Sequence, residues 1–415
     1  MTVPGARPSI LRHPPFAAFF VAASISNAAG WMQLVAVPAL LFDLTHKASW
    51  LGLSTLATMV PAVVLTPWAG VLSDRANRRL ILIATQTVAM VATFVLWGLF
   101  VTDRISAASI VLVGLVNGVA TGFQTPTWQA FVPSLVPAED MLDAVRLNST
   151  QFTVARAVGP AAAGIVVATF GVGAAIAVNA ATYLLVIGVL AVVRPPQVIG
   201  VRDRSTNAFA EGARHVWHHR GVRLAVLLAL FTALTGQSLQ YIASAIANDG
   251  FGRKSTDSAS LLTALGIGAL LASLVAGFLA RRYSPYRMMI GALCLYVSGP
   301  LIVASTRSFA MAVAGYFVGG LAHLTFAVQV NSLIQVETPD HLRGRAISFY
   351  LLAILTGIAL GPLVLGSLID AIGVHTTLLL DGSLVAVVST WVVVSGRLRV
   401  FEPLRVRQAT AAISA

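Results

Sequence analysis

The residues with the clearest chemistry are charged groups set between long apolar runs. The stretch Gly70 to Arg79 reads GVLSDRANRR and places one carboxylate, Asp74, beside Arg75, Arg78 and Arg79. Such groups form ion pairs and charge-assisted hydrogen bonds, and they are costly to leave in hydrocarbon. The chain must therefore reach a membrane surface here. A weaker copy, from Gly277 through Arg281 to Arg287, follows 207 residues later.

A single arginine, Arg156, lies inside an apolar run. It is about 13 residues into its predicted span, which corresponds to roughly 20 Å of helix. An arginine at that depth needs a water-filled cavity or a partner. It either binds an anion or senses protons on a transport path, or it is structural and bonds carbonyls at a span end or Gln124.

Few other titratable groups could carry protons through the apolar runs. His323 lies inside one run, where it is either a proton carrier or a packing residue. Asp43 closes the first run. No acid is expected in the middle of any span, because the remaining candidates (Asp249, Asp370 and Asp381) fall near predicted outer ends. The proton-coupling candidates are therefore Asp43, His323 and Arg156.

The elements that must position these residues are membrane-spanning helices. Of 415 residues, 57% are hydrophobic and 10% are charged, whereas soluble proteins carry about 25% charged residues. Repeated apolar runs of about 20 residues indicate helices that satisfy their own backbone groups in lipid. We predict twelve spans, at 16–44, 50–72, 80–101, 106–132, 143–168, 173–193, 224–248, 258–280, 288–305, 309–336, 346–369 and 376–395.

The distribution of basic residues predicts the orientation of these spans. Twenty-one of the 27 Lys and Arg residues fall on one side, and five fall on the other. The positive-inside rule then places both termini and the middle loop in the cytoplasm of a cell membrane. This placement accounts for the net charge of +12 without nucleic-acid binding. Arg7 and Arg12 lead into a full-length span, so no cleavable signal is expected, and the single Cys294 favours neither a disulfide nor a metal site.

The two halves of the chain repeat each other at an offset of 202 residues. Matching positions are Gly159 and Gly361, Pro160 and Pro362, Gly164 and Gly366, Gly171 and Gly373, Pro137 and Pro339, Gln129 and Asn331, and Asn179 and Asp381. Two parallel six-helix bundles related by pseudo-symmetry are therefore expected. The predicted domains are 1–193, a linker at 194–223, 224–395 and a cytoplasmic tail at 396–415.

The linker contains an amphipathic pattern built on Phe209, Ala213, Val216, Trp217 and Arg220. This pattern favours a helix on the cytoplasmic membrane surface. Three histidines, at 215, 218 and 219, lie on it. They are compatible with a zinc site, but a solvated polar face is the preferred interpretation.

Twelve spans with a charged loop after the second resemble the major facilitator superfamily. Gly70, Leu72, Asp74, Arg75, Arg78 and Arg79 fit its signature loop, in which Asn77 replaces the usual glycine. Further segments resemble the branch that contains the enterobactin exporter and the macrolide efflux proteins: Gly30–Gln33, Pro126–Ala130, Leu147-Asn148, Ala155–Pro160, Glu211-Gly212, and Pro339 with Leu342–Arg345. The resemblance implies an all-α membrane protein of the major facilitator fold and a proton-driven exporter of a bulky, partly apolar compound.

The resemblance also implies which charged loops face each other. Span 2 would neighbour span 11, so Asp74 could pair with Arg343 and Arg345 as well as with Arg78. Span 5 would neighbour span 8, so Arg281 could pair with Glu139, Asp140 and Asp143. These pairs would form a conformational gate on the cytoplasmic side. The alternative is that they are ordinary charges that set topology.

Amides and aromatic residues at helical spacing could line a substrate cavity. They are Asn27 and Trp31, then Asn117, Gln124 and Trp128, then Gln237 and Tyr241, with Arg156 and His323. Interhelical hydrogen bonding is the alternative for each. No nucleotide-binding loop and no catalytic constellation is present, so the sequence predicts a secondary transporter, expected to be a monomer without cofactors. A lipid or lysolipid flippase and a small-nutrient uptake carrier are the alternatives.

Overall fold

The computed structural model describes residues 10–195 and 208–402, and within these ranges the regular structure is entirely helical. Arg7, Arg202, Arg204 and the tail beyond Glu402 lie outside the described residues. Eleven helical segments of the described chain are long and apolar enough to cross a membrane. The chain forms two compact units, Met1–Val37 with Val60–Arg202, and Pro38–Met59 with Asp203–Ala415.

The first unit contains most of the first half of the chain. Its helices are α1 (Pro14–Thr45), α2 (Ala48–Arg75), α3 (Arg78–Val101), α4 (Ala107–Phe131) and α5 (Met141–Val192), with short turns η1 (Ile10–Arg12), η2 (Val132–Leu135) and η3 (Ala138–Asp140). The end of α1 and the start of α2, from Pro38 to Met59, belong to the second unit.

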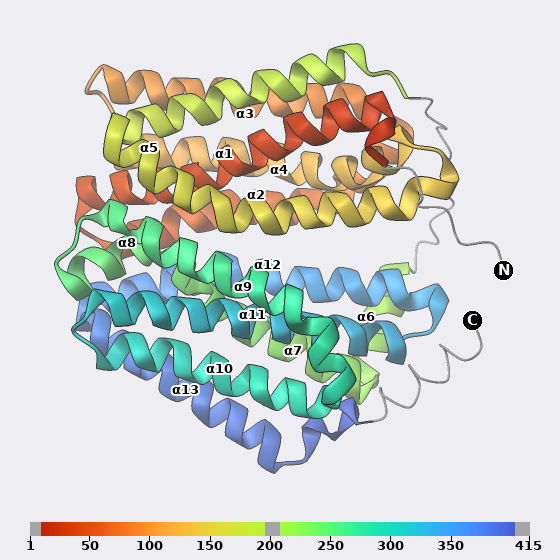
Figure 1. The fold of residues 1–415 in the computed structure, drawn as a ribbon, viewed down its shortest axis with the longest axis vertical. Helices are drawn as coiled ribbons and strands as arrows, with labels where there is room; N and C mark the ends of the chain where they lie inside the picture. The colour runs from red at the N-terminus through yellow and green to blue at the C-terminus, as the bar shows by residue number, and fades with distance from the viewer. Residues whose placement is uncertain (1–9, 196–207, 403–415) are drawn as a thin grey trace. The chain divides into compact units, whose positions relative to one another are not determined.

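Helix α5 is two spans joined by a reversal. Its 52 residues contain one non-helical position, Gly171, with φ 81° and ψ 171°. A residue with a Cβ rarely adopts such angles, so glycine allows the chain to turn back without a loop. Figure 1 shows the yellow first part of α5 turning into a yellow-green part that runs back beside it. With α5 counted as two spans, the predicted twelve spans are confirmed.

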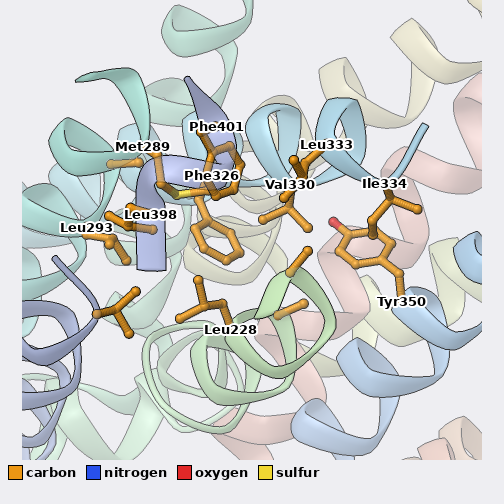
Figure 2. Close-up of a cluster of buried hydrophobic side chains, with 14 of the residues drawn as sticks. Leu228, Met289, Leu293, Phe326, Val330, Leu333, Ile334, Tyr350, Leu398 and Phe401 are labelled. Carbon is orange, nitrogen blue, oxygen red and sulfur yellow. The ribbon is translucent and has the colours of Figure 1, made fainter. Parts of the chain in front are cut away.

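The second unit contains α6 (Ala208–His218), α7 (Arg220–Leu234), α8 (Ala243–Ala245), α9 (Ser258–Arg282), α10 (Pro285–Ser305), α11 (Phe309–Glu337), α12 (Asp340–Ile372) and α13 (Val374–Val394). Short turns lie at Gly236–Gln240, Ile246–Gly250, Ser255–Asp257 and Arg397–Phe401. Its core gathers apolar side chains from α7, α10, α11 and α12 and from the final turn. Leu228, Phe326, Val330 and Phe401 meet there (Figure 2).

The seventh predicted span, 224–248, is not one continuous helix, and this part of the prediction is wrong. α7 ends at Leu234, where Thr235 takes φ −99° and ψ −104°. The carbonyls freed by the break are bonded by side chains: Ser238 Oγ donates to Ala233 O at 2.7 Å, and Tyr316 Oη donates to Leu239 O at 3.0 Å. Breaks inside membrane proteins are tolerated when neighbouring side chains satisfy the backbone in this way.

Candidate transport pathway

Arg156 lies against an aromatic ring in the first unit. Its guanidinium carbon is 5.2 Å from the centroid of the Trp31 ring, a cation–π distance. Arg156 is the sixteenth residue of α5, so about 22 Å of helix precedes it. It therefore lies in the middle of the first span of α5, as the sequence predicted.

Gly159, one turn after Arg156, lets α1 and α5 approach. A Cβ at Gly159 would be 2.2 Å from the Cβ of Trp31 and 2.9 Å from the carbonyl of Ala28. These distances are too short for any other residue without movement of α1. The glycine thus sets the position of the indole ring, and the indole in turn faces the guanidinium.

The other predicted cavity residues of the first unit differ in their surroundings: two asparagines have buried atoms without partners among the described residues, whereas Trp128 is packed in the core. Asn27 Nδ2 and Asn117 Oδ1 are buried atoms without a hydrogen-bond partner in the described part of the chain. Asn27 is one helical turn from Trp31 on α1, and Gln124 is partly exposed. Trp128 differs, because it is 5% exposed, packs on Phe19 and donates to Asn148 Oδ1 at 3.4 Å. Trp128 is therefore a core residue in this structure.

In the second unit, His323 is hydrogen-bonded to a tyrosine. Its Nδ1 is 3.1 Å from Tyr296 Oη, and both side chains lie among the helices of the unit. Gln237 and Tyr241 fall on the break after α7 and not on a regular helix, so the predicted shared face of a helix does not form. Gln237 is buried and Tyr241 is partly exposed.

The sequence analysis placed Asp381 near an outer end, but it is well inside a span. It is the eighth of 21 residues of α13 and is only 4% exposed. Its Oδ2 atom has no hydrogen-bond partner in the described residues. The matching residue of the first half, Asn179, is also buried but donates to Gln33 Oε1. The 202-residue repeat aligns Asp381 with Asn179, so the sequence already indicated a polar residue at this position in both halves.

The signature loop connects α2 and α3. Asp74 pairs with Arg78 at 3.7 Å, as predicted for a local pair, and Arg75 is exposed. Arg79 donates through Nε to Leu190 O and through Nη2 to Ala191 O at 2.7 Å. Arg79 thus binds the start of α3 to the end of α5. Gly70 accepts a hydrogen bond from Ser73 through its carbonyl at 2.9 Å.

The acidic residues around the start of α5 have different partners, and those of Asp140 lie near the N-terminus of the chain. Asp140 lies 2.7 Å from His13 Nε2 and 3.4 Å from Arg12 Nη2. The hydrogen bond from His13 and the charge of Arg12 lower the pKa of Asp140, while partial burial opposes them. Asp143 pairs with Arg146 at 3.3 Å, and Glu139 is exposed. Sequence reasoning did not foresee the contact with His13.

The basic residues at the start of α12 also have partners inside their own unit. Arg343 Nε donates to Gln335 O at 3.1 Å, and Arg345 pairs with Glu211 of the linker helix α6. Arg281, at the end of α9, is exposed. The predicted pairing of Arg343 and Arg345 with Asp74, and of Arg281 with the acids Glu139, Asp140 and Asp143, stays a prediction.

The linker helix α6 packs its apolar face on the second unit. Val216 is 6% exposed within the core, and a Cβ on Gly212 would lie 2.9 Å from Arg345 Cβ. The next residue, Trp217, is 63% exposed. The three predicted histidines border an open pocket of about 700 Å³, where His219 pairs with Glu337 at 3.4 Å. No group that could hold a metal ion occurs among the described residues.

A carboxylate caps the start of α2. Asp370, near the end of α12, accepts hydrogen bonds from Ala48 N at 2.6 Å and from Ser49 N at 3.0 Å. Glycines bring the two helices together, because a Cβ on Gly366 would be 2.5 Å from Ala48 O and one on Gly52 would be 2.3 Å from Leu363 Cα. The cap satisfies two amides that the helix itself leaves unbonded. Asp43, at the end of α1, is exposed.

These features define a multi-pass membrane transporter of the major facilitator type. The sequence matches the transmembrane secretion effector family over residues 7–411, and the chain belongs to this family.

Two sets of proteins are similar to it. The enterobactin exporter EntS of Shigella boydii serotype 18 is 26% identical over 362 residues, which is 86% of this chain and 85% of that protein, and EntS of Escherichia coli O1:K1 matches equally. Among solved structures, a mutant of the nucleoside transporter NupG covers 93% of this chain and 100% of its own, with a TM-score of 0.79 and 12% identity. A D-xylose–proton symporter covers 94% of this chain and 98% of its own, with a TM-score of 0.71 and 13% identity. At these identities the structures bear on the fold alone, and they agree with the predicted architecture.

Proposed function

We propose that this chain is a proton-coupled exporter of a bulky, partly apolar compound that carries an acidic group. Its substrate class would be a siderophore-like or other secondary metabolite. The observation that carries this proposal is the Arg156–Trp31 pair in the middle of the first unit. A fixed cation beside an indole suits a ligand that combines negative charge with an aromatic or apolar surface.

Two buried amide groups of the first unit support a ligand site over a purely structural role for this pair. Asn27, one turn from Trp31, has a buried amide nitrogen without a partner in the described chain, and Asn117 has a buried carbonyl oxygen in the same state. Buried polar atoms are normally hydrogen-bonded, so each exception needs an explanation. A bound substrate with hydroxyl or carbonyl groups would supply the missing partners.

For the coupling proton we propose Asp381 in addition to His323. An ionisable residue buried inside a span is expensive and marks an ion or proton pathway by default. Asp381 meets this description more closely than Asp43, which is exposed at the end of α1. His323, bonded to Tyr296, offers a second protonatable group in the same unit.

Export from the cytoplasm is supported by the similarity to the enterobactin exporters and by the predicted placement of the basic loops on the cytoplasmic side. On the same grounds we propose that the protein lies in the bacterial inner membrane with both termini in the cytoplasm. The direction is tested with inverted vesicles, in which an exporter accumulates substrate when the interior is acidified.

The substrate class is tested by binding measurements on the purified protein. An acidic catecholate siderophore, a neutral macrolide and a cationic dye are titrated against wild type, Arg156→Ala and Arg156→Lys. We expect the acidic compound to bind wild type best and to lose about tenfold or more in affinity in Arg156→Ala, as for a charged hydrogen bond. Arg156→Lys should recover part of that loss.

Arg146→Ala is the matched control, because Arg146 precedes Arg156 on the same helix but is 69% exposed at the surface. It should bind like wild type. If neutral or cationic compounds bind equally to wild type and Arg156→Ala, and the acidic one binds neither, then Arg156 is structural and the proposed substrate class is wrong.

A further inference from the structure

A small pocket lined by arginines lies where the signature loop meets the end of α5. Its volume is about 130 Å³. It is built entirely from the first unit, at the end of the spans where the basic loop reaches the surface. The residues that line it are Asn77, Arg78, Arg79, Phe131, Ser134, Arg194 and Pro195.

Two of the three arginines are held in place by backbone carbonyls. Arg79 uses Nε and Nη2 to bond Leu190 and Ala191, close to Arg194 in the chain. Arg78 donates to Ser73 O at 3.0 Å and to Ala130 O at 3.3 Å. These bonds hold both groups in place, and Arg79, whose guanidinium has five N–H donors, has donors beyond the two in these bonds. The guanidinium groups of Arg78 and Arg79 are therefore held in place before a ligand binds.

The third arginine, Arg194, follows the end of α5 and is exposed. Within the described residues it takes part in no hydrogen bond or ion pair. A ligand could therefore bind Arg194 without breaking a hydrogen bond or ion pair of the described residues. Arg194 can also be removed without breaking a contact that holds the helices.

The start of α3 adds a further positive element. Asn77 caps this 24-residue helix by accepting from Arg79 N at 3.0 Å and Leu80 N at 3.3 Å. The N-terminus of a helix carries partial positive charge and favours anions. Three guanidinium groups and a helix terminus thus converge on one small space.

The lining contains no carboxylate. Asp74 pairs with Arg78 at 3.7 Å but does not line the pocket, and it neutralises one of the three charges at most. Ser134 donates its hydroxyl to Phe131 O at 2.6 Å, so the arginines carry the recognition. The space is large enough for a tetrahedral oxyanion and too small for a bulky transport substrate.

We propose that this pocket binds a phosphate group. Arginine matches phosphate oxygens in bidentate geometry, and clusters of arginine at a membrane surface attract phosphate-bearing ligands. The group would belong either to an anionic phospholipid or to a soluble phosphate ester. A phosphate bound by the arginines of α3 and by Arg194 after α5 would link these two helices outside the substrate pathway. Its binding would therefore stabilise the first unit.

Thermal unfolding of the delipidated, full-length protein tests the proposal. Inorganic phosphate and glycerol phosphate are titrated at constant ionic strength against chloride, and phosphatidylglycerol is compared with phosphatidylcholine in nanodiscs. Wild type should be stabilised by phosphate, by phosphatidylglycerol or by both. Arg194→Ala should raise the concentration for half-maximal stabilisation about tenfold, as expected for loss of one charged hydrogen bond.

The control is Arg146→Ala, which removes one exposed positive charge outside the pocket. It should respond like wild type. Stabilisation by the lipid alone assigns the phosphate to a headgroup, and stabilisation by the soluble anions assigns it to a soluble ester. If neither stabilises wild type, or if Arg146→Ala weakens the response as much as Arg194→Ala, the phosphate site does not exist.

Discussion

Gly171 and Gly373, which lie 202 residues apart, adopt nearly the same left-handed backbone conformation. Their φ angles are both 81°, and their ψ angles are 171° and 164°. Each residue connects one span directly to the next, at the same point of its half of the chain. The sequence repeat is thus reproduced in the backbone, and both turns depend on a residue without a side chain.

Substitution of either glycine should destabilise the protein. Gly171→Ala and Gly373→Ala each force a Cβ into a conformation that is essentially restricted to glycine, at a cost of about 1–3 kcal/mol. Thermal or denaturant unfolding of the purified variants measures this cost. Gly188→Ala is the control, since Gly188 is helical and has open space around it. It should be neutral or slightly stabilising, and an equal loss in all three variants would contradict the explanation.

Removal of the Asp370 carboxylate should loosen the start of α2. Asp370→Asn loses a charged acceptor for Ala48 N and Ser49 N, and loss of a helix cap costs about 1 kcal/mol. Hydrogen exchange of peptides that cover Ala48 and Ser49 should become several-fold faster. Asp257→Asn serves for comparison, because Asp257 pairs only with the nearby Arg253. Unchanged exchange in Asp370→Asn would show that the cap is not stabilising.

Replacement of Asp381 should abolish proton coupling while the fold is kept. Asp381→Asn is nearly isosteric, and the matching position of the first half is already an asparagine, Asn179. We expect normal expression and unfolding temperature, with substrate-driven proton release reduced at least tenfold if this carboxyl carries the proton. Asp43→Asn, at an exposed position, should behave like wild type. Full proton release from Asp381→Asn would leave His323 as the candidate.

The contact between Asp140 and His13 predicts a dependence of stability on pH. The pKa of Asp140 is lowered in the folded protein by His13 and Arg12. Its contribution to stability is therefore present above the ordinary pKa of an aspartate and is lost as the pH falls through the lower, folded value. Unfolding temperatures of wild type and Asp140→Asn should differ at neutral pH and converge in acid. A difference of the same size in acid as at neutral pH would rule out this origin.

Much of the fold could be predicted from the sequence. Apolar run length and the basic loops located twelve spans, and the repeat of Gly159 and Gly361 showed two halves. The break after Leu234 was missed, because hydropathy does not register hydroxyl groups such as those of Ser238 and Tyr316 that satisfy a broken helix. The burial of Asp381 was missed because position along a span does not give the facing neighbours.

The candidate site was predicted less completely. The depth of Arg156 followed from its position in an apolar run, but its partner Trp31 lies 125 residues earlier and depends on the contact made by Gly159. The spacing of Trp128 suggested a cavity, whereas packing on Phe19 places it in the core. Pairings between charged loops of the two halves stay predictions, since local spacing cannot specify long-range partners.

Because α1 and α2 are each divided between the two units, the hairpin that they form joins one unit to the other. The unit boundary falls at Pro38 in α1 and beside Pro61 in α2. A proline cannot donate the backbone hydrogen bond that stiffens a helix, so each helix lacks one such bond close to the boundary. The segment between these prolines lies in the second unit, where Asp370 holds it, and it continues at both ends into the parts of α1 and α2 that belong to the first unit. Any rotation of one unit against the other must either bend this hairpin at its prolines or detach it from α12.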